Sequence, residues 1–230
     1  MHVAIVTVGD ELLVGDTVNT NATWLCDRLS ERGVRVRRVA VVPDEVGEIA
    51  RVVNEYHAEY DAVIVTGGLG PTHDDVTMEA IAAAFGRDVV PNEQAAAWLA
   101  DRGYSAGDLT AETTHLPADC RPLRNVEGVA PGAVVEAVYV LPGVPAEMKA
   151  MFETIADEFE GTPTHTVAVN VAEPESELLD RFTELQERFD VAVGSYPGEH
   201  VTVKITADDA SEAEEAAAWL RDRSTAPERS

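Results

Sequence analysis

The sequence predicts an α/β protein whose central sheet is mainly parallel. Up to about residue 160, short runs of branched apolar residues alternate with longer segments of helical period, which is typical of successive β-α-β units. A glycine-rich segment directly follows one of the most apolar runs, Ala62-Val63-Ile64-Val65. Beyond Gly161-Thr162-Pro163 the order changes to strand, helix, strand, strand, helix, which predicts a small α+β unit.

The strands of the larger unit are recognised as apolar runs bounded by polar or turn-forming residues. They are expected at His2–Val8, Val34–Val42, Asp61–Thr66, within 131–135 after a Pro-Gly turn, and at Val138–Leu141. Helices are expected at Asn21–Arg32, Glu45–Tyr56, about Asp75–Phe85, Glu93–Asp101 and Ala146–Phe159. Gly33 and Gly86 provide two helix ends, and Pro145 suits the first position of the last helix. The stretch Gly103–Pro117 is expected to be a loop with a short helix.

The predicted domains are residues 1–162, residues 163–223 and a loose tail at 224–230. In the smaller unit, the expected elements are a strand at His165–Val171, a helix at Glu175–Arg188, strands at Val191–Ser195 and His200–Thr206, and a helix at Ser211–Arg223.

The charge balance excludes several classes of partner. The formal net charge is −25, and Lys149 and Lys204 are the only lysines. Such a field repels nucleic acid. Because the acid is spread over the whole chain, we interpret it as adaptation of the surface to salt, of the halophile type, and an ordinary acidic protein is the alternative. No apolar run approaches the roughly 20 residues that span a bilayer. The start has no signal-peptide pattern and there are only two cysteines, so a cytoplasmic protein is expected, without a membrane partner.

The glycine-rich loop is the strongest functional signal. Glycines at the carboxyl end of a strand let backbone N–H groups approach an anion, and the start of the next helix adds further N–H groups. The predicted phosphate contacts are Gly67, Gly68, Leu69, Gly70, Pro71, Thr72 and Thr77. A tight turn without a ligand is the alternative. A Walker loop is excluded because no lysine is near, and a dinucleotide fingerprint is excluded because His73 stands where its third glycine would be.

Carboxylates follow three of the predicted strands. Asp74 and Asp75 follow the glycine loop, Asp10 and Glu11 follow the first strand, and Asp44 follows the second. Any one of Asp44, Asp74 and Asp75 could be a helix N-cap. Because phosphate and carboxylate repel each other, a Mg²⁺-type cation or a proton-transfer role would explain so many acids beside a phosphate site.

Two more segments complete this edge of the sheet. Asn21 and Thr20 are each interpreted as a helix N-cap, with Asn21 also a candidate ligand contact. Pro142, Gly143 and Pro145 form a loop able to close over a ligand. No Ser-His-Asp, Cys-His or zinc-type spacing is present, so covalent catalysis has no support.

The motifs then resemble a known family. Gly9-Asp10-Glu11-Leu12-Leu13, Asn19-Thr20-Asn21, the segment from Gly67 to Thr77 and Leu141-Pro142-Gly143-Val144-Pro145-Ala146-Glu147-Met148 occur in that order. Over about residues 1–165 the chain resembles the N-terminal part of the CinA (competence/damage-inducible) proteins, a branch of the MoaB/Mog molybdopterin-binding fold. The resemblance implies a three-layer αβα domain, usually oligomeric. Asp44 and Asp75 match two aspartates of the molybdopterin branch, in which the pocket binds the pterin and assists adenylylation with ATP and Mg²⁺.

The resemblance to CinA implies a metal-dependent ADP-ribose pyrophosphatase, and this is the leading hypothesis. It assigns Asp75 and Asp44 to catalysis, and Asp10, Glu11 and Asp74 to a divalent metal ion, Mg²⁺ or Co²⁺. The alternatives are a molybdopterin-binding or adenylylating protein of molybdenum cofactor biosynthesis and a nucleotide-binding module without turnover. The expected partners are a nucleotide or pterin and further copies of the chain, as a dimer or trimer.

Overall fold

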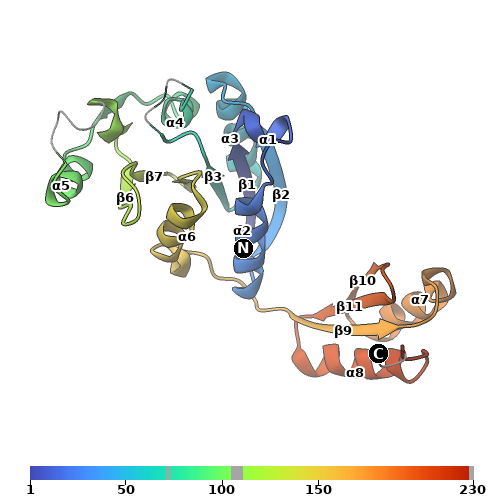
Figure 1. Ribbon diagram of the computed structural model, residues 1–230. Helices are drawn as coiled ribbons and strands as arrows, with labels where there is room; N and C mark the ends of the chain where they lie inside the picture. Colours follow the sequence, from blue (N-terminus) through green and yellow to red (C-terminus); the bar gives the residue numbers. More distant parts are fainter. Residues whose placement is uncertain (71, 73, 105–110, 228–230) are drawn as a thin grey trace. The chain divides into compact units, whose positions relative to one another are not determined.

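The computed structural model describes residues 1–70, 72, 74–104 and 111–227, and divides into two units, Met1–Gly161 and Thr162–Ser230 (Figure 1). Each unit has its own hydrophobic core. No helix in the described part of the chain is both long and apolar enough to span a membrane.

The larger unit contains a six-stranded sheet in the order β2-β1-β3-β8-β7-β6. The strands are β1 (His2–Val8), β2 (Arg35–Val42), β3 (Ala62–Thr66), β6 (Arg121–Leu123), β7 (Gly132–Val135) and β8 (Val138–Leu141). The first four in sheet order are parallel, while β7 and β6 add an antiparallel edge. The chain passes from β1 to β2 on one side and then to β3 on the other, so the loops after β1 and β3 lie at a point where the strand order reverses.

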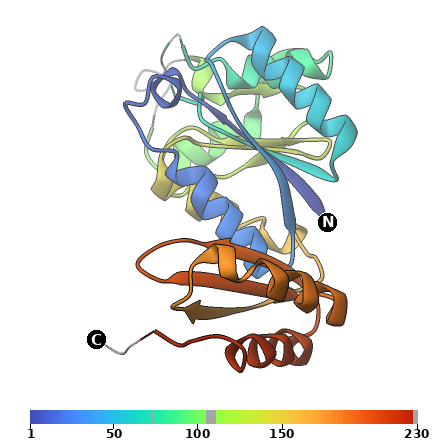
Figure 2. The same cartoon turned by 90° about the vertical axis from the view of Figure 1, so that its right-hand side faces the viewer.

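Helices cover both faces of this sheet, as Figure 2 shows. The helices are α1 (Asp10–Leu13), α2 (Thr20–Glu31), α3 (Val46–Glu59), α4 (Thr77–Ala84), α5 (Glu93–Asp101) and α6 (Pro145–Glu153), with 3₁₀ turns η1 (Ala111–Thr114) and η2 (Ala156–Glu158). Strands β4 (Val89–Pro91) and β5 (His115–Pro117) form a separate antiparallel pair. The predicted three-layer αβα fold is confirmed.

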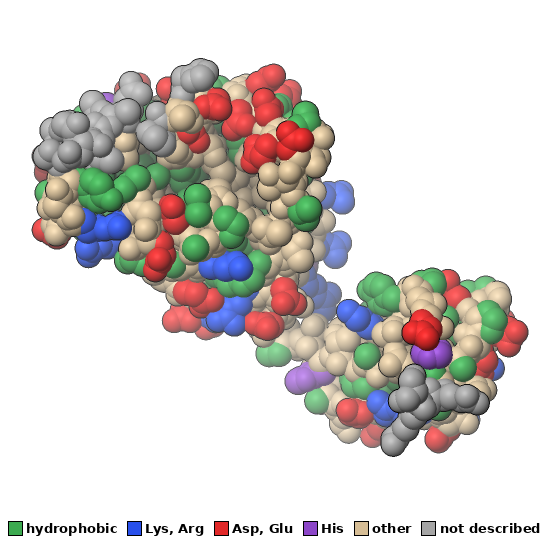
Figure 3. Space-filling view, in the orientation of Figure 1, with side chains coloured by type: hydrophobic (Ala, Val, Ile, Leu, Met, Phe, Trp, Pro, Cys, Tyr) green, Lys and Arg blue, Asp and Glu red, His purple; other side chains and the backbone are tan. Residues whose placement is uncertain are grey.

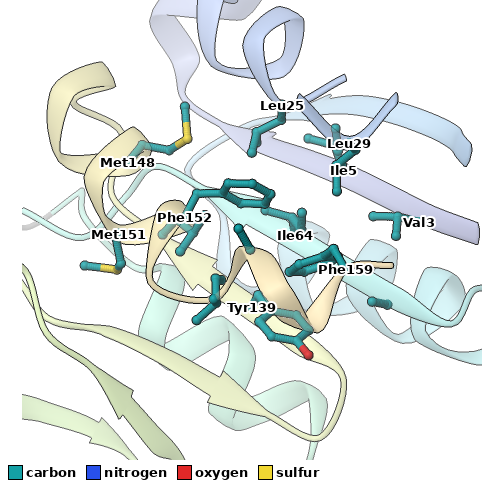
Figure 4. Close-up of a cluster of buried hydrophobic side chains, with 14 of the residues drawn as sticks. Val3, Ile5, Leu25, Leu29, Ile64, Tyr139, Met148, Met151, Phe152 and Phe159 are labelled. Carbon is teal, nitrogen blue, oxygen red and sulfur yellow. The ribbon is translucent and has the colours of Figure 1, made fainter. Parts of the chain in front are cut away.

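Successive side chains of each strand point to opposite faces of the sheet, which explains why helices form a layer on each face. Ile5 and Ile64 face one side of the sheet and pack with side chains of α2 and α6, including Leu25 and Phe152 (Figure 4). Their neighbours Val6, Val63 and Val65 face the opposite side and pack under α3 and α4. Strands that are apolar on both faces must be buried on both, which is why helices lie on each side.

Several sequence predictions were wrong in detail. Helix α6 ends at Glu153, where the Thr154 hydroxyl donates to the carbonyl oxygen of Met151, and only a 3₁₀ turn follows before Phe159. The short helix α1 follows β1 directly, where no helix was predicted. Strands β4, β5 and β6 were not predicted because three-residue strands have too few positions to show alternation.

The smaller unit is the predicted α+β arrangement. It consists of β9 (His165–Val171), the 3₁₀ turn η3 (Glu175–Glu177), α7 (Leu179–Arg188), β10 (Ala192–Tyr196), β11 (Val201–Ala207) and α8 (Ala210–Arg221). The antiparallel sheet has the order β10-β11-β9, and α7 and α8 contribute to one core with it. The tail was expected to be loose from residue 224, but Thr225 is held by two hydrogen bonds. Its carbonyl oxygen accepts from the Ala172 N–H, and its own N–H donates to the Glu173 carboxylate. Residues 228–230 lie outside the described part.

Candidate functional site

A cleft of about 420 Å³ lies at the carboxyl ends of the parallel strands. Its wall combines residues of four loops that sequence analysis placed on one edge, those after β1, β2, β3 and β8. The predicted site residues that line it are Glu11, Asp44, Gly67, Gly68, Leu69, Gly70, Asp74, Asp75, Pro142 and Gly143. Asp10 is absent from this lining.

The loops approach one another at Gly67, whose φ of +103° favours glycine. A Cβ atom on Gly67 would lie 2.3 Å from the carbonyl oxygen of Val8, and one on Gly143 would lie 3.2 Å from the Cα of Gly67. The Gly67 N–H donates to the carbonyl oxygen of Leu141 at 3.2 Å. The loops after β1, β3 and β8 are therefore in backbone contact.

The glycine loop keeps only part of its amides for a ligand. The N–H groups of Gly67 and Thr77 bond to Leu141 and Gly68, whereas those of Gly68, Leu69 and Gly70 donate to no group among the described residues. Three consecutive N–H groups at a strand-to-helix turn are suited to an anion. Pro71 and His73 lie outside the described residues.

Both loop threonines have internal partners. The Thr77 side chain is buried and its hydroxyl donates to the carbonyl oxygen of Gly67 at 2.9 Å. The Thr72 hydroxyl donates to Oδ2 of Asp75. Both threonines were predicted as phosphate contacts, with the Thr72 hydroxyl as a donor, but in the structure each hydroxyl already bonds within the loop.

Asp75 lies in the loop rather than at the start of α4, whose N-cap position is Val76. Its Oδ2 accepts both from the Thr72 N–H at 3.0 Å and from the Thr72 hydroxyl. A Cβ atom on Gly70 would lie 2.6 Å from the same oxygen, so the loop passes directly over the carboxylate. With both bonds on Oδ2, the other oxygen of this cleft-lining side chain stays free among the described residues.

Asp44 is not the cap of α3, because that position is Glu45 and no side chain caps the helix. Instead, Oδ2 of Asp44 accepts from the Asp10 N–H at 2.9 Å and joins the loops after β2 and β1. Burial raises the pKa of the Asp44 carboxyl above its ordinary value, the Asp10 N–H lowers it, and the nearby Asp10, Glu11 and Asp74 carboxylates raise it further.

The raised pKa predicts a specific effect of Asp44→Asn. At pH values between the pKa of the unfolded state and that of the folded state, the native state binds more protons than the unfolded state. The free energy of unfolding of the wild type therefore rises as the pH falls through this range, and it is lower at higher pH. Asparagine keeps an acceptor for Asp10 but removes the repelled charge. In metal-free protein at neutral pH, we expect the Tm of Asp44→Asn to exceed that of wild type by about 1–3 °C, with no gain below about pH 4.

Thermal unfolding at several pH values measures this difference. Asp27→Asn, which removes an exposed carboxylate from α2, is the matched control and should leave Tm unchanged. A lower Tm for Asp44→Asn at neutral pH would contradict the proposed repulsion.

The predicted metal ligands do not form a closed cluster. In the described part of the chain, no three His, Cys, Asp or Glu side chains are grouped to hold a metal ion, so the set Asp10, Glu11 and Asp74 is not assembled. Mg²⁺, however, commonly takes one or two carboxylates, several waters and the oxygens of a bound phosphate. The carboxylates in the cleft fit that mode, since they offer oxygen donors only.

The cleft is acidic. Its lining includes Glu11, Asp44, Asp74, Asp75 and Glu147, and no Lys or Arg is among the described residues that line it. Figure 3 shows Asp and Glu side chains gathered over this end of the larger unit, around α1. An anionic ligand in this cleft therefore requires cations to offset the carboxylates.

A second cavity of about 280 Å³ adjoins the cleft and shares Gly68–Gly70 and Asp75 with it. Away from the shared residues it is lined by the apolar side chains of Met78, Val89 and Leu116, together with the polar residues Glu79 and His115. Sequence analysis missed this lining because β4 and β5 were not predicted.

Asn125 holds one wall of the cleft, and sequence analysis also missed it. Its Nδ2 donates to Oε2 of Glu147 at 2.7 Å and to the carbonyl oxygen of Ala130 at 2.9 Å. Its Oδ1 accepts from the N–H groups of Glu127 and Gly128. All four hydrogen-bonding positions of this buried amide are used, which fixes the turn that carries Val129 and Ala130 into the lining.

The expected contacts Asn21 and Pro145 lie beside the cleft. The N-cap of α2 is Asn19, whose Oδ1 accepts from the Ala22 N–H, rather than Thr20 or Asn21. Asn21 donates through Nδ2 to the carbonyl oxygen of Gly143 at 2.7 Å. Pro145 begins α6 and lines a smaller recess next to the cleft.

Comparison with known proteins is consistent with this geometry. Residues 4–160, more than half of the chain, match the family described as "Probable molybdopterin binding domain" (MoCF_biosynth). The chain belongs to this family. As a member of MoCF_biosynth it carries the MoaB/Mog-like fold predicted from the sequence. Residues 163–227 match a second family, described as "FAD synthase, middle domain".

Relatives of this MoCF_biosynth chain occur in archaea. A protein of Archaeoglobus fulgidus is 38% identical over 211 residues, which cover 91% of this chain and 92% of that one. Protein TK1472 of Thermococcus kodakarensis is 37% identical and covers 97% of each chain. Among solved structures, the CinA protein of Thermoplasma acidophilum, described as having unknown function, is 38% identical with a TM-score of 0.65, covering 69% of this chain and 97% of that chain. The predicted resemblance to CinA is thereby confirmed.

Proposed function

We propose that this chain is a metal-dependent nucleotide pyrophosphatase that cleaves ADP-ribose or a related nucleotide. The main support is the composition of the cleft, in which three free amides from Gly68 to Gly70 lie beside carboxylates, with no Lys or Arg among the described lining residues. The amides suit a phosphate group, while the carboxylates require a cation with it. The resemblance to CinA supplies the substrate class.

Each group would have a defined part in the reaction. The amides from Gly68 to Gly70 would hold the phosphates, and Asp75 and Asp44 would orient the ligands around the reacting phosphorus. A bound divalent ion, Mg²⁺ or Co²⁺, would neutralise phosphate charge and lower the pKa of an attacking water. Glu11 and Asp74 are the further candidate ligands for it. Addition of water to one phosphorus breaks the bridging P–O bond and releases AMP and ribose 5-phosphate.

Incubation of the purified chain with ADP-ribose in molar salt, with Mg²⁺ or Co²⁺ and with a chelator, tests the proposal. We expect AMP release that depends on the added ion. If no AMP forms with any divalent ion while the protein remains folded, the hydrolase proposal is wrong.

The family description favours a second candidate, a molybdopterin-binding or adenylylating role. The apolar side chains of Met78, Val89 and Leu116 in the second cavity would suit a flat heterocycle, and His115 and Glu79 would offer it polar contacts. A fluorescent pterin that copurifies with the chain would favour this role. A nucleotide-binding module without turnover is the third candidate, and it predicts binding of ADP-ribose with no product under any condition.

We further propose that the chain acts in the cytoplasm as a homodimer or homotrimer, with no nucleic-acid partner. Size-exclusion chromatography with light scattering in molar salt measures the assembly directly.

The net charge of −25 leads to a stability prediction, because unscreened carboxylates repel one another. We propose that the surface is adapted to high salt and expect Tm to fall by about 10 °C or more when KCl is lowered from molar to roughly 0.1 M. The same dilution at a pH low enough to protonate the carboxylates is the control and should change Tm much less. An equal Tm at both salt concentrations and neutral pH would contradict this adaptation.

A further inference from the structure

A small recess of about 100 Å³ lies behind the contact between Gly67 and Gly143. It is formed by the carboxyl ends of β1 and β3 and the starts of α2 and α6. The recess shares Val8, Glu11, Gly67 and Gly143 with the main cleft, so the two spaces are neighbours. A group attached to a phosphate in the cleft would have this recess within reach.

Two buried oxygens in the recess lack hydrogen-bond partners. Thr66 is 1% exposed and Asn21 is 9% exposed, and neither Oγ1 of Thr66 nor Oδ1 of Asn21 bonds to any described group. Buried polar atoms in proteins are nearly always satisfied, so two unpaired oxygens on residues that line one recess indicate an occupant. Both residues line this recess.

Two neighbouring polar groups, the Asn21 amide nitrogen and the Thr7 hydroxyl, are already paired, so neither of them satisfies these two oxygens. Nδ2 of Asn21 donates to the carbonyl oxygen of Gly143 at 2.7 Å, so the orientation of the amide is set and Oδ1 must be an acceptor. The Thr7 hydroxyl, in register with Thr66 on the adjacent strand, donates to the carbonyl oxygen of Ala40 and accepts from Nδ2 of Asn19.

The occupant that suits this recess is a neutral group that donates hydrogen bonds. Oδ1 of Asn21 accepts only, the Thr66 hydroxyl accepts or donates, and the Glu11 carboxylate in the same wall accepts only. An ionised phosphate offers only acceptors to these oxygens, whereas the hydroxyl groups of a sugar offer donors of the right kind. The volume, about a quarter of that of the main cleft, suits a small group rather than a whole nucleotide.

We propose that this recess is a sugar subsite in which Asn21 and Thr66 bond to hydroxyl groups of a ribose attached to the phosphates. The proposal rests on the proposed function in taking a sugar nucleotide as the ligand. It makes Thr66 and Asn21 determinants of specificity, separate from the carboxylates that act on the phosphates.

Calorimetric titration of the full chain with ADP-ribose and with inorganic pyrophosphate, both with Mg²⁺ in molar salt, tests the subsite. Thr66→Val keeps the shape of the side chain and removes its hydroxyl. We expect this variant to bind ADP-ribose about 5–10-fold more weakly and pyrophosphate within about twofold of wild type. Thr66→Ser, which keeps the hydroxyl, should restore most of the affinity for ADP-ribose. The Tm of Thr66→Val without ligand should not fall, because the lost hydroxyl has no partner.

Of the four other outcomes, three overturn the proposal and one leaves it standing without the hydrolase activity. Equal affinity of wild type and Thr66→Val for ADP-ribose would mean that the recess holds only water. Equal weakening for both ligands would mean that the substitution disturbs the phosphate loop. ADP-ribose that binds as expected without AMP release would remove the hydrolase proposal and keep the subsite, whereas no binding of ADP-ribose to wild type would remove both. Thr66→Ala serves if Thr66→Val does not fold.

Discussion

Asp75→Asn is expected to lower kcat for AMP release by about 100-fold or more while the chain stays folded. The asparagine oxygen can still accept both bonds from Thr72, so the loop should keep its shape. The charge that would bind a cation or orient the attacking water is lost. Affinity for ADP-ribose without a metal ion should be unchanged or tighter, because a carboxylate beside the phosphates is removed, and the gain in affinity on adding Mg²⁺ should shrink.

Single-turnover assays and calorimetry with and without Mg²⁺ measure these effects. Asp27→Asn removes the same charge from the exposed face of α2 and should leave kcat within about twofold of wild type. Unchanged turnover in Asp75→Asn would rule out the assigned role of Asp75. Binding in both proteins with turnover in neither would support the nucleotide-binding module instead.

Gly67→Ala is expected to lower the free energy of unfolding by about 3 kcal/mol or more. The φ of +103° strains any residue with a side chain, and the new Cβ would lie 2.3 Å from the carbonyl oxygen of Val8. Because that contact is with backbone at the end of a buried strand, relief requires the loops after β1 and β3 to separate. Urea unfolding at constant salt measures the loss.

Gly15→Ala separates strain from collision. Gly15 also has a positive φ, of +80°, but a Cβ there would meet nothing within 4 Å. We expect this control to cost about 1 kcal/mol. If the two variants lose the same stability, the close contact between the β1 and β3 loops does not contribute.

Most of the fold could be predicted because its signals are local. The apolar runs at His2–Val8 and Val138–Leu141 and the helical period at Glu93–Asp101 predicted β1, β8 and α5 with the observed bounds. Element ends were less certain, as at α6, where bonds of the last turn decide the end. Very short strands such as β6 form only because neighbouring strands present a free edge.

The candidate site, too, could be predicted from the sequence only in part. The glycine loop and the carboxylates after β1, β2 and β3 could be placed on one edge because parallel strands end at the same side of a sheet. The roles of single side chains could not. Thr72 and Thr77 were predicted to contact the phosphates, yet the hydroxyl of each is bonded within the loop. Asn125 had no signal of its own, since its partner Glu147 lies 22 residues away.

The sequence by itself determined the αβα class, the position of the glycine loop and the acidity of the chain, because periodicity, glycine spacing and charge are properties of nearby residues or of composition. Only the tertiary structure decided which polar atoms are left for a ligand. Asn21 is turned by the carbonyl oxygen of Gly143, 122 residues away, and Thr66 is left unpaired in the described structure at the end of a buried strand. Hydrogen-bond partners are chosen by segments that meet only after folding, so the free groups of a site appear only then.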